Sequence, residues 1–271
     1  MNSAQGAMLR AQMRLEENSR RLEELLPVIG WPSLCFSSQQ CSLDDIENVE
    51  HIMLDADTCN HIAVNTVQQS MCPEWHLLRK ERLSASSKAH RIRIRTANFE
   101  ELARDLCNVK PFYGQACKYG TDMEATARKK YEVKEDCTVT RIGLVISKVQ
   151  GWLCCSPDGL VLADEVVLLE IKCPFRCREQ PIFDQQGNLF VDYLHVEDGK
   201  LQLKSSHVYY TQVQVSLYIL NLDVCHFFVY SPLQVVNVKV RRDSNFLEWL
   251  IPKMEWFYFK HYKPQLMKAS G

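Results

Sequence analysis

Two carboxylates and a lysine stand close together in this chain. Asp158 lies in a Ser-Pro-Asp-Gly turn, and Glu170 and Lys172 follow at the end of an apolar, β-branched run. Alternate side chains of a strand share a face, so Glu170 and Lys172 point to the same side while Ile171 points into the core. Two carboxylates and an amine at one spot can hold a divalent cation and a water molecule beside a phosphodiester.

The surrounding sequence favours a site over a coincidence. Residues 166–169 are continuously apolar, which is typical of a strand buried on both faces. Ionised side chains are costly at such a strand unless they are paired or bind a metal. The competing interpretation is a surface turn that carries Asp158 and an exposed strand end that carries a Glu–Lys pair. Because the turn, the apolar strand and the short spacing occur together, we favour a metal-dependent nuclease.

These residues resemble the motifs of the PD-(D/E)XK nuclease superfamily and, more narrowly, of the phage lambda exonuclease and YqaJ-type viral recombinase family. Three further blocks fit the narrower family in the expected order. Their residues are Trp75, Arg79 and Ser86 in the first block, Tyr119 and Glu124 in the second, and Tyr210, Gln212 and Gln214 in the third. The resemblance covers residues from about 73 to 230 and leaves residues 1–70 outside.

The resemblance implies roles for the carboxylate group. Asp158 and Glu170 would bind one or two Mg²⁺ or Mn²⁺ ions, which prefer oxygen ligands. The backbone carbonyl of Ile171 would complete the metal shell, and Lys172 would orient or polarise the attacking water. Glu124 would join the carboxylates, although the sequence alone favours an ordinary solvated helix residue at this position.

The two glutamines of the Q-V-Q block require a choice. Gln212 and Gln214 lie about 200° apart around a helix, so both cannot face one metal site. The first glutamine is the family's site residue, which indicates Gln212, and Gln214 is expected to pack or form hydrogen bonds elsewhere. Gln212 could also be an ordinary polar helix residue. Its neighbours Tyr209 and Val213 instead indicate a half-buried surface, where a polar group needs a partner.

A second site is implied by the resemblance. In the lambda-like family an arginine and two serines grip a terminal 5′ phosphate, and the matching positions are Arg79, Ser86 and Ser156. A guanidinium and two hydroxyls are suitable donors for a phosphate, although Ser84 replaces the family's usual threonine. Basic side chains also recur from residue 80 to residue 95. They predict either a solvated helix face or a surface that binds the nucleic-acid backbone.

Length and composition fit a globular protein. The 271 residues suffice for one domain, residues 71–271, with an N-terminal helical extension, residues 1–70. Net charge is −1, so attraction to nucleic acid must come from a local patch. No apolar run is long enough for a membrane span, and the start is too acidic for a signal or transit peptide. We therefore expect an intracellular protein, nuclear or cytoplasmic and not secreted, whose twelve cysteines are mostly reduced core residues.

Hydrophobic patterns predict the elements that must position these residues. Helices are expected over residues 7–26, 74–94 with an internal turn, 98–107, 123–131, 207–220 and 245–259. Strands are expected over residues 139–146, 153–154, 160–161, 166–171, 225–230 and 235–240, and a hairpin or loop with turns at 187–188 and 198–199. Residues 31–72 are typical of a partly helical linker. The predicted class is α/β, with a mixed central sheet flanked by helices, and the resemblance implies a restriction-endonuclease-like core.

Sequence and resemblance together predict a metal-dependent deoxyribonuclease, most specifically a 5′-to-3′ exonuclease that acts on linear duplex ends in recombination, repair or viral-type DNA processing. Two other functions stay open, namely an endonuclease on DNA or RNA and a relative that binds nucleic-acid ends without cutting. The complete set of Asp158, Glu170 and Lys172 opposes a loss of activity. Lambda-type exonucleases can form rings that encircle DNA, so a homo-oligomer and a recombination partner protein also stay open.

Overall fold

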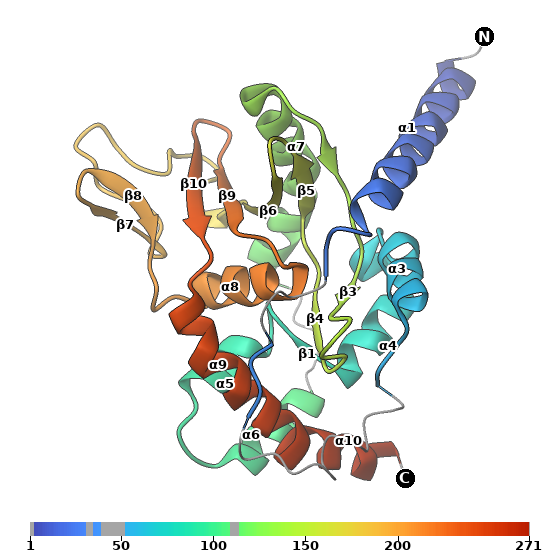
Figure 1. The fold of residues 1–271 in the computed structure, drawn as a ribbon. Coiled ribbons are helices and arrows are strands. Elements are labelled where there is room, and N and C mark those ends of the chain that lie inside the picture. The colour runs from blue at the N-terminus through green and yellow to red at the C-terminus, as the bar shows by residue number, and fades with distance from the viewer. Residues whose placement is uncertain (1–2, 31–34, 39–51, 109–113, 271) are drawn as a thin grey trace.

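The centre of the molecule is a five-stranded mixed sheet with the order β10-β9-β6-β5-β2 (Figure 1). A computed structural model describes residues 3–30, 35–38, 52–108 and 114–270. The strands of the sheet are β2 (Val139–Thr140), β5 (Gly159–Leu162), β6 (Val166–Lys172), β9 (Val224–Tyr230) and β10 (Val235–Arg241). β6 is antiparallel to β5 and parallel to β9, so the strand that carries Glu170 and Lys172 is paired on both edges.

Helices cover both faces of this sheet, which confirms the predicted α/β class (Figure 1). On one face, α7 (Gln115–Glu135) shares a hydrophobic cluster with Val167, Leu169 and Ile171 of β6. On the other face, Leu168 belongs to the main core together with α8 (Val208–Leu220). Because side chains of a strand alternate, Glu170 and Lys172 lie on the face of Leu168, and Ile171 points into the α7 cluster, as predicted.

The remaining elements surround this centre. A smaller sheet has the order β1-β4-β3, and its strands are β1 (Leu83–Ser84), β3 (Val145–Ile146) and β4 (Leu153–Cys155). A separate hairpin consists of β7 (Leu194–Glu197) and β8 (Lys200–Leu203). The other helices are α3 (Ala56–Asn65), α4 (Pro73–Glu81), α5 (Ala89–Ile94), α6 (Phe99–Cys107), α9 (Ser244–Phe257) and α10 (Lys263–Ser270), with short helical turns at Gln69–Met71 and Phe175–Cys177 and a π-helix at Tyr258–Tyr262.

Some predicted elements differ from the observed ones. The run 139–146 is not one strand, because β2 joins the central sheet and β3 joins the smaller one. Between them Gly143 passes so close to Thr66 that an added Cβ would lie 2.3 Å from its Oγ1. β1 was not predicted, since two residues are too short to show an alternating pattern. The helix predicted over 123–131 begins earlier, at Gln115.

The N-terminal helix α1 (Ser3–Leu25) has two parts in different environments. Its first half projects from the body of the molecule (Figure 1). Its end and the following turn are buried in the main core through Leu22, Leu25, Leu26 and Ile29. Within the predicted linker 31–72, residues 31–34 and 39–51 lie outside the described residues, and α3 forms in the rest. The division at residue 70 stays a prediction.

Two further expectations concern composition. No helix within the described ranges is long and apolar enough to cross a membrane. Of the eleven cysteines that the structure describes, five are buried, namely Cys59, Cys154, Cys155, Cys177 and Cys225. The other six are half-buried or exposed, so the expectation that most cysteines are core residues is wrong for the described part of the chain.

Candidate active site

Strand register holds the turn of Asp158 beside Glu170. Gly159, the first residue of β5, pairs with Leu169, so Asp158 lies next to Glu170 just beyond the last strand pair. An added Cβ on Gly159 would lie 2.2 Å from Val139 Cγ1, so the packing of β2 here requires glycine. Since β5 no longer pairs with β6 beyond this point, Asp158 Oδ2 accepts the Ile171 N–H at 2.6 Å.

Glu170 is almost completely buried, with 2 % of its surface exposed. Its Oε1 accepts hydrogen bonds from Lys172 Nζ, at 2.6 Å, and from Gln212 Nε2 of α8. Its Oε2 has no hydrogen-bond partner among the described residues. A buried carboxylate oxygen without a partner is costly, so Oε2 is an atom that a metal ion would fit.

The two carboxylates and the lysine change each other's pKa values. Burial raises the pKa of Glu170 to about 7, the Lys172 ammonium opposes this shift, and the Asp158 charge adds to it. Burial also raises the pKa of Asp158, against the effects of Lys172 and the Ile171 N–H. Burial lowers the pKa of Lys172, but the two carboxylates outweigh burial and leave that pKa above its ordinary value. One ammonium therefore does not fully stabilise two buried carboxylates.

A cavity of about 390 Å³ opens over this group, and Asp158, Ile171, Lys172 and Glu124 are among the residues that line it. Glu124 reaches the cavity from α7, where it forms an ion pair with Arg128 one helix turn away. Burial, and next the charge of Asp158, raise the pKa of Glu124. The structure thus brings Glu124 to the carboxylates, which the sequence alone did not favour.

The donor set of this group fits a hard cation. In the described part of the chain, no three His, Cys, Asp or Glu side chains gather tightly enough to hold a metal ion. A cation bound by Asp158 and Glu170 would therefore take its other ligands from backbone and water. Mg²⁺ characteristically binds proteins in this way, through one or two carboxylates and several water molecules.

The two glutamines of α8 separate as helix geometry predicts. Gln212 faces Glu170, whereas Gln214 is turned toward the start of α9. Gln214 Nε2 donates to the Arg241 carbonyl at 2.8 Å, and its Oε1 accepts the Asp243 N–H at 2.8 Å. Gln214 thereby joins the end of β10 to the cap of α9 and has a structural role.

The structure also brings Arg79, Ser86 and Ser156 together. The Arg79 guanidinium donates from Nη1 to Ser156 Oγ and from Nη2 to Ser86 Oγ, each at 3.1 Å. It lies 4.2 Å from the centroid of the Trp75 ring, whose Nε1 donates to the same Ser156 oxygen at 2.9 Å. Burial lowers the pKa of Arg79, and the thiols of Cys154 and Cys155 oppose this shift. A half-buried guanidinium held by hydroxyls is suited to an anion, and we call this cluster the Arg79 pocket.

The basic run from residue 80 to residue 95 was predicted to be either a solvated helix face or a surface for the nucleic-acid backbone, and both interpretations are wrong for Arg82 and Lys88. Arg82 and Lys88 are buried and donate to backbone carbonyls, Lys88 to those of Arg79 and Arg82 among others. Arg91 and Arg95 form ion pairs with acidic residues of α6. Lys88 closes the C-terminal turn of α4 and so helps to present Arg79.

Two residues near the site were not predicted. Arg128 forms the ion pair with Glu124, and the Tyr209 ring lies 4.6 Å from Lys172 Nζ. The i, i+4 spacing between Glu124 and Arg128 could have indicated the first contact. The second joins α8 to β6 and had no local signal beyond a tyrosine close to Gln212.

The fold and the site define a class. A mixed sheet that places an aspartate before β5 and an E-x-K pair at the end of β6 is the arrangement of the PD-(D/E)XK nuclease superfamily. The family model of the YqaJ-like viral recombinase domain matches residues 74–223, more than half of the chain. The chain belongs to this family, and the match includes every predicted site residue from Arg79 to Gln212. No curated protein matches the chain.

Solved structures share the fold. LHK-Exo, an alkaline exonuclease from Laribacter hongkongensis solved in complex with dAMP, is 21% identical with a TM-score of 0.54, and the match covers 73% of this chain and 98% of that chain. SOX, the shutoff and exonuclease protein of Kaposi's sarcoma-associated herpesvirus, in an RNA complex is 12% identical with a TM-score of 0.55, covering 78% and 75%. A SOX–DNA complex is 12% identical with a TM-score of 0.50, covering 78% and 72%. At these identities the likeness confirms the fold alone.

Proposed function

We propose that the protein is a metal-dependent deoxyribonuclease that degrades linear duplex DNA from its 5′ ends. The observation that carries this proposal is the adjacency of two groups with opposite charge requirements. Glu170 has a buried carboxylate oxygen without a partner, and Arg79 is a half-buried cation held by two serines. Ser156 of the Arg79 pocket stands two residues before Asp158. A terminal phosphate at Arg79 would place the end of a strand beside the carboxylates.

The residues of the carboxylate group have complementary roles in this proposal. Asp158 and Glu170, with the Ile171 carbonyl, would hold one or two Mg²⁺ or Mn²⁺ ions. When bound, such an ion makes a water molecule more acidic and offsets negative charge on the phosphodiester. Lys172 is an ammonium beside two carboxylates, so it can donate hydrogen bonds that orient the water, but it cannot accept a proton. Gln212 holds Oε1 of Glu170, and Glu124 would join the group through a water molecule.

The Arg79 pocket would hold the strand end. A guanidinium can donate two hydrogen bonds to one phosphate, and the hydroxyls of Ser86 and Ser156 can donate two more. Contacts of this kind position a nucleic acid without reading its sequence. The complexes of LHK-Exo with dAMP and of SOX with DNA and RNA support a nucleic-acid ligand for this fold.

A substrate panel tests the proposal. End-labelled linear duplex with a 5′ phosphate, the same duplex with a 5′ hydroxyl, closed circular duplex, single-stranded DNA and RNA are incubated with Mg²⁺, Mn²⁺ or EDTA. We expect the phosphorylated duplex to be degraded fastest, the circle to stay intact and EDTA to stop the reaction. Linearised circles or cut RNA would instead support an endonuclease, and end binding without cleavage would support a non-cutting relative.

The oligomeric state, the protein partners and the cellular location of the protein are separate questions. A ring-forming homo-oligomer, a recombination partner protein and a nuclear or cytoplasmic location all stay predictions. Light scattering of the purified protein tests the first of them directly.

A further inference from the structure

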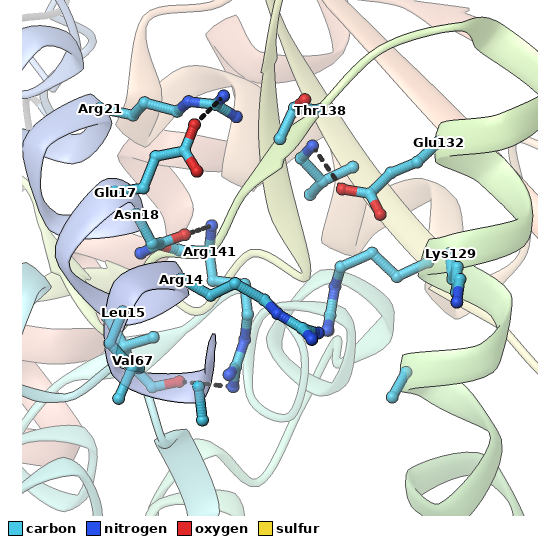
Figure 2. A pocket seen from close by; sticks show the side chains of 14 residues that line it. Arg14, Leu15, Glu17, Asn18, Arg21, Val67, Lys129, Glu132, Thr138 and Arg141 are labelled. Carbon is cyan, nitrogen blue, oxygen red and sulfur yellow. Dashed lines mark hydrogen bonds and ion pairs between the residues drawn. The ribbon is translucent and has the colours of Figure 1, made fainter. Parts of the chain in front are cut away.

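A second cleft lies between α1 and α7 (Figure 2). It is separate from the cavity that Asp158 and Lys172 line. Its volume is about 710 Å³. Residues of the segment around β2 line it together with the two helices. Two carboxylates line this cleft, Glu17 and Glu132. Five cationic side chains line it from several elements, namely Arg14, Arg21, Arg128, Lys129 and Arg141. In a protein with a net charge of −1 this is a local excess of positive charge.

Both carboxylates are already engaged within the protein. Glu17 pairs with Arg21 at 2.6 Å, and Glu132 Oε1 accepts the Val139 N–H at 2.9 Å (Figure 2). Arg141 is held by the backbone, because its Nη2 donates to the Val67 carbonyl at 3.1 Å. The two carboxylates offset only part of the charge of the five cations, so the described lining of the cleft keeps a positive excess.

Two cationic side chains of the cleft, and one donor of a third, have no partner among the described residues. Arg14 and Lys129 form no ion pair within the described residues, and Arg14 reaches from α1 toward the α7 side of the cleft (Figure 2). The third is Arg128, whose Nε is buried without a partner among those residues although its Nη2 pairs with Glu124. The buried Nε of Arg128 is a donor without an acceptor, which is costly, and Arg14 and Lys129 are exposed cations without an ion-pair partner among the described residues. An anion in the cleft would compensate the positive charge of these side chains.

Helix α7 connects this cleft to the candidate active site. Glu124 lines the cavity over the carboxylates, and its partner Arg128 lines the cleft one turn further along. From Glu124 to Glu132 the helix rises about 12 Å. Phosphates of one strand follow each other at about 3.4 Å along a duplex axis, so this length of helix is enough to face more than one of them.

We propose that the cleft binds the phosphodiester backbone of the nucleic-acid strand that extends from the active site, an inference that rests on the proposed function. Arg14, Arg128 and Lys129 contact the phosphates of this strand. Since the family model matches only residues 74–223, α1 lies outside the matched domain, and the extension supplies one wall of a longer binding path. The contacts are to phosphates, so they are independent of sequence.

A matched pair of double variants tests this surface. Arg14→Ala with Lys129→Ala removes two cations of the cleft. Arg20→Ala with Lys130→Ala removes two exposed cations from the same two helices, and neither of these residues lines the cleft. Binding of fluorescent 20-nucleotide DNA and RNA strands is measured by anisotropy in EDTA, which prevents cleavage, and a 4-nucleotide strand is measured alongside. Thermal melts verify that both proteins are folded.

The cleft variant should bind the 20-nucleotide strands about tenfold more weakly than the control variant. Its salt dependence should be shallower by about 0.7 per lost phosphate contact, and its binding of the 4-nucleotide strand should be unchanged. If the affinities for DNA and for RNA fall equally, the cleft binds the backbone of both nucleic acids. If only the affinity for DNA falls, the cleft is specific for DNA. Equal binding by the two double variants overturns the inference. The proposed function fails separately, if the wild-type protein cuts no nucleic acid with Mg²⁺ or Mn²⁺.

Discussion

The Arg79 pocket and the carboxylate group are neighbours in the chain through Ser156 and Asp158, but they have opposite charges. In the Arg79 pocket a cation is held by neutral partners, the hydroxyls of Ser86 and Ser156 and the ring of Trp75. In the carboxylate group a single ammonium faces Asp158 and Glu170, and one oxygen of Glu170 lacks a partner.

The difference shows how one fold can preorganise two sites, one for an anion and one for a cation. Neutral partners fix the shape of Arg79 without neutralising it, so the pocket keeps its attraction for an anion. The carboxylates keep a net negative charge, so their group keeps its attraction for a cation. Both are held in place before any ligand arrives, which is the condition for strong electrostatic stabilisation. Because the two regions use different side chains, a substitution can disturb one of them and leave the other intact.

The largest effect is expected in Lys172→Ala. Loss of the ammonium removes the proposed water-orienting group, so the rate of cleavage should fall by about 10²–10⁴-fold. We expect a fall of the same size in Glu170→Gln. Both rates are measured on 5′-phosphorylated linear duplex. The exposed Lys239→Ala serves as the control and should retain full activity. Full activity of the Lys172→Ala variant would contradict the proposed role of Lys172 in orienting the attacking water.

The next effect concerns metal binding by Asp158→Asn. A neutral amide oxygen is a poorer ligand for a hard cation than a carboxylate, so calorimetry with Mn²⁺ or Mg²⁺ should show affinity reduced by about 100-fold, or about 2.7 kcal/mol. Arg79→Ala is the control from the other region and should bind metal normally. Unchanged affinity in Asp158→Asn would rule out Asp158 as a ligand.

A smaller effect is expected in Arg79→Ala. The wild-type preference for a 5′-phosphorylated over a 5′-hydroxyl duplex should largely vanish, at a cost of roughly 1.5–3 kcal/mol, or tenfold and more. Cleavage should continue at a reduced rate, because Asp158, Glu170 and Lys172 remain. Arg79→Lys keeps the charge but loses the two-pronged geometry, so it should restore only part of the preference. A wild-type enzyme that ignores the 5′ phosphate would contradict the role of this pocket.

Metal affinity should also depend on pH through Glu170. Its pKa of about 7 in the folded protein lies above its ordinary value of 4.5. The folded protein therefore binds a proton that the unfolded chain lacks, and metal-free stability should fall as pH rises from about 4.5 to 7. A metal must displace this proton, so its affinity should rise up to about tenfold per pH unit and level off above pH 7. Calorimetry of metal binding in buffers of different ionisation heat measures the proton that Glu170 releases. A metal affinity that does not change with pH in the wild-type protein would contradict a protonated Glu170.

The smallest effects separate the two glutamines. Gln212→Ala should lower cleavage less than tenfold with little change in melting temperature, because it releases one contact of Glu170. Gln214→Ala should instead lower the free energy of unfolding by about 1–3 kcal/mol, because it leaves the Arg241 carbonyl and the Asp243 N–H without their partner. Activity assays and thermal melts of both variants decide this, and the reverse pattern would exchange the two roles.

Sequence patterns were most informative where the contacts are local. The alternation of a strand was enough to place Glu170 and Lys172 on one face and Ile171 on the other. Helix geometry was enough to separate Gln212 from Gln214. The Arg79 pocket depended on the family resemblance, because Ser156 lies 77 residues away in the chain from Arg79.

Local patterns failed where burial depends on distant partners. Arg82 and Lys88 looked like surface cations, yet carbonyls of several segments and the Tyr262 hydroxyl surround them. The run 139–146 looked like one strand, yet Gly143 against Thr66 divides it between two sheets. Charge and hydrophobicity along a sequence do not encode which distant backbone a side chain meets.

The sequence by itself determined the class of fold, the E-x-K strand, the turn of Asp158 and the separation of the two glutamines around one helix, because each follows from hydrophobic patterns or residue spacing along the chain. The choice of Gln212 as the site residue came from the family resemblance. Only the tertiary structure decided that Glu124 reaches the carboxylates, that one oxygen of Glu170 is left without a partner, and that α1 and α7 enclose a basic cleft. These features arise where elements far apart in the chain pack together, and their geometry is set by that packing.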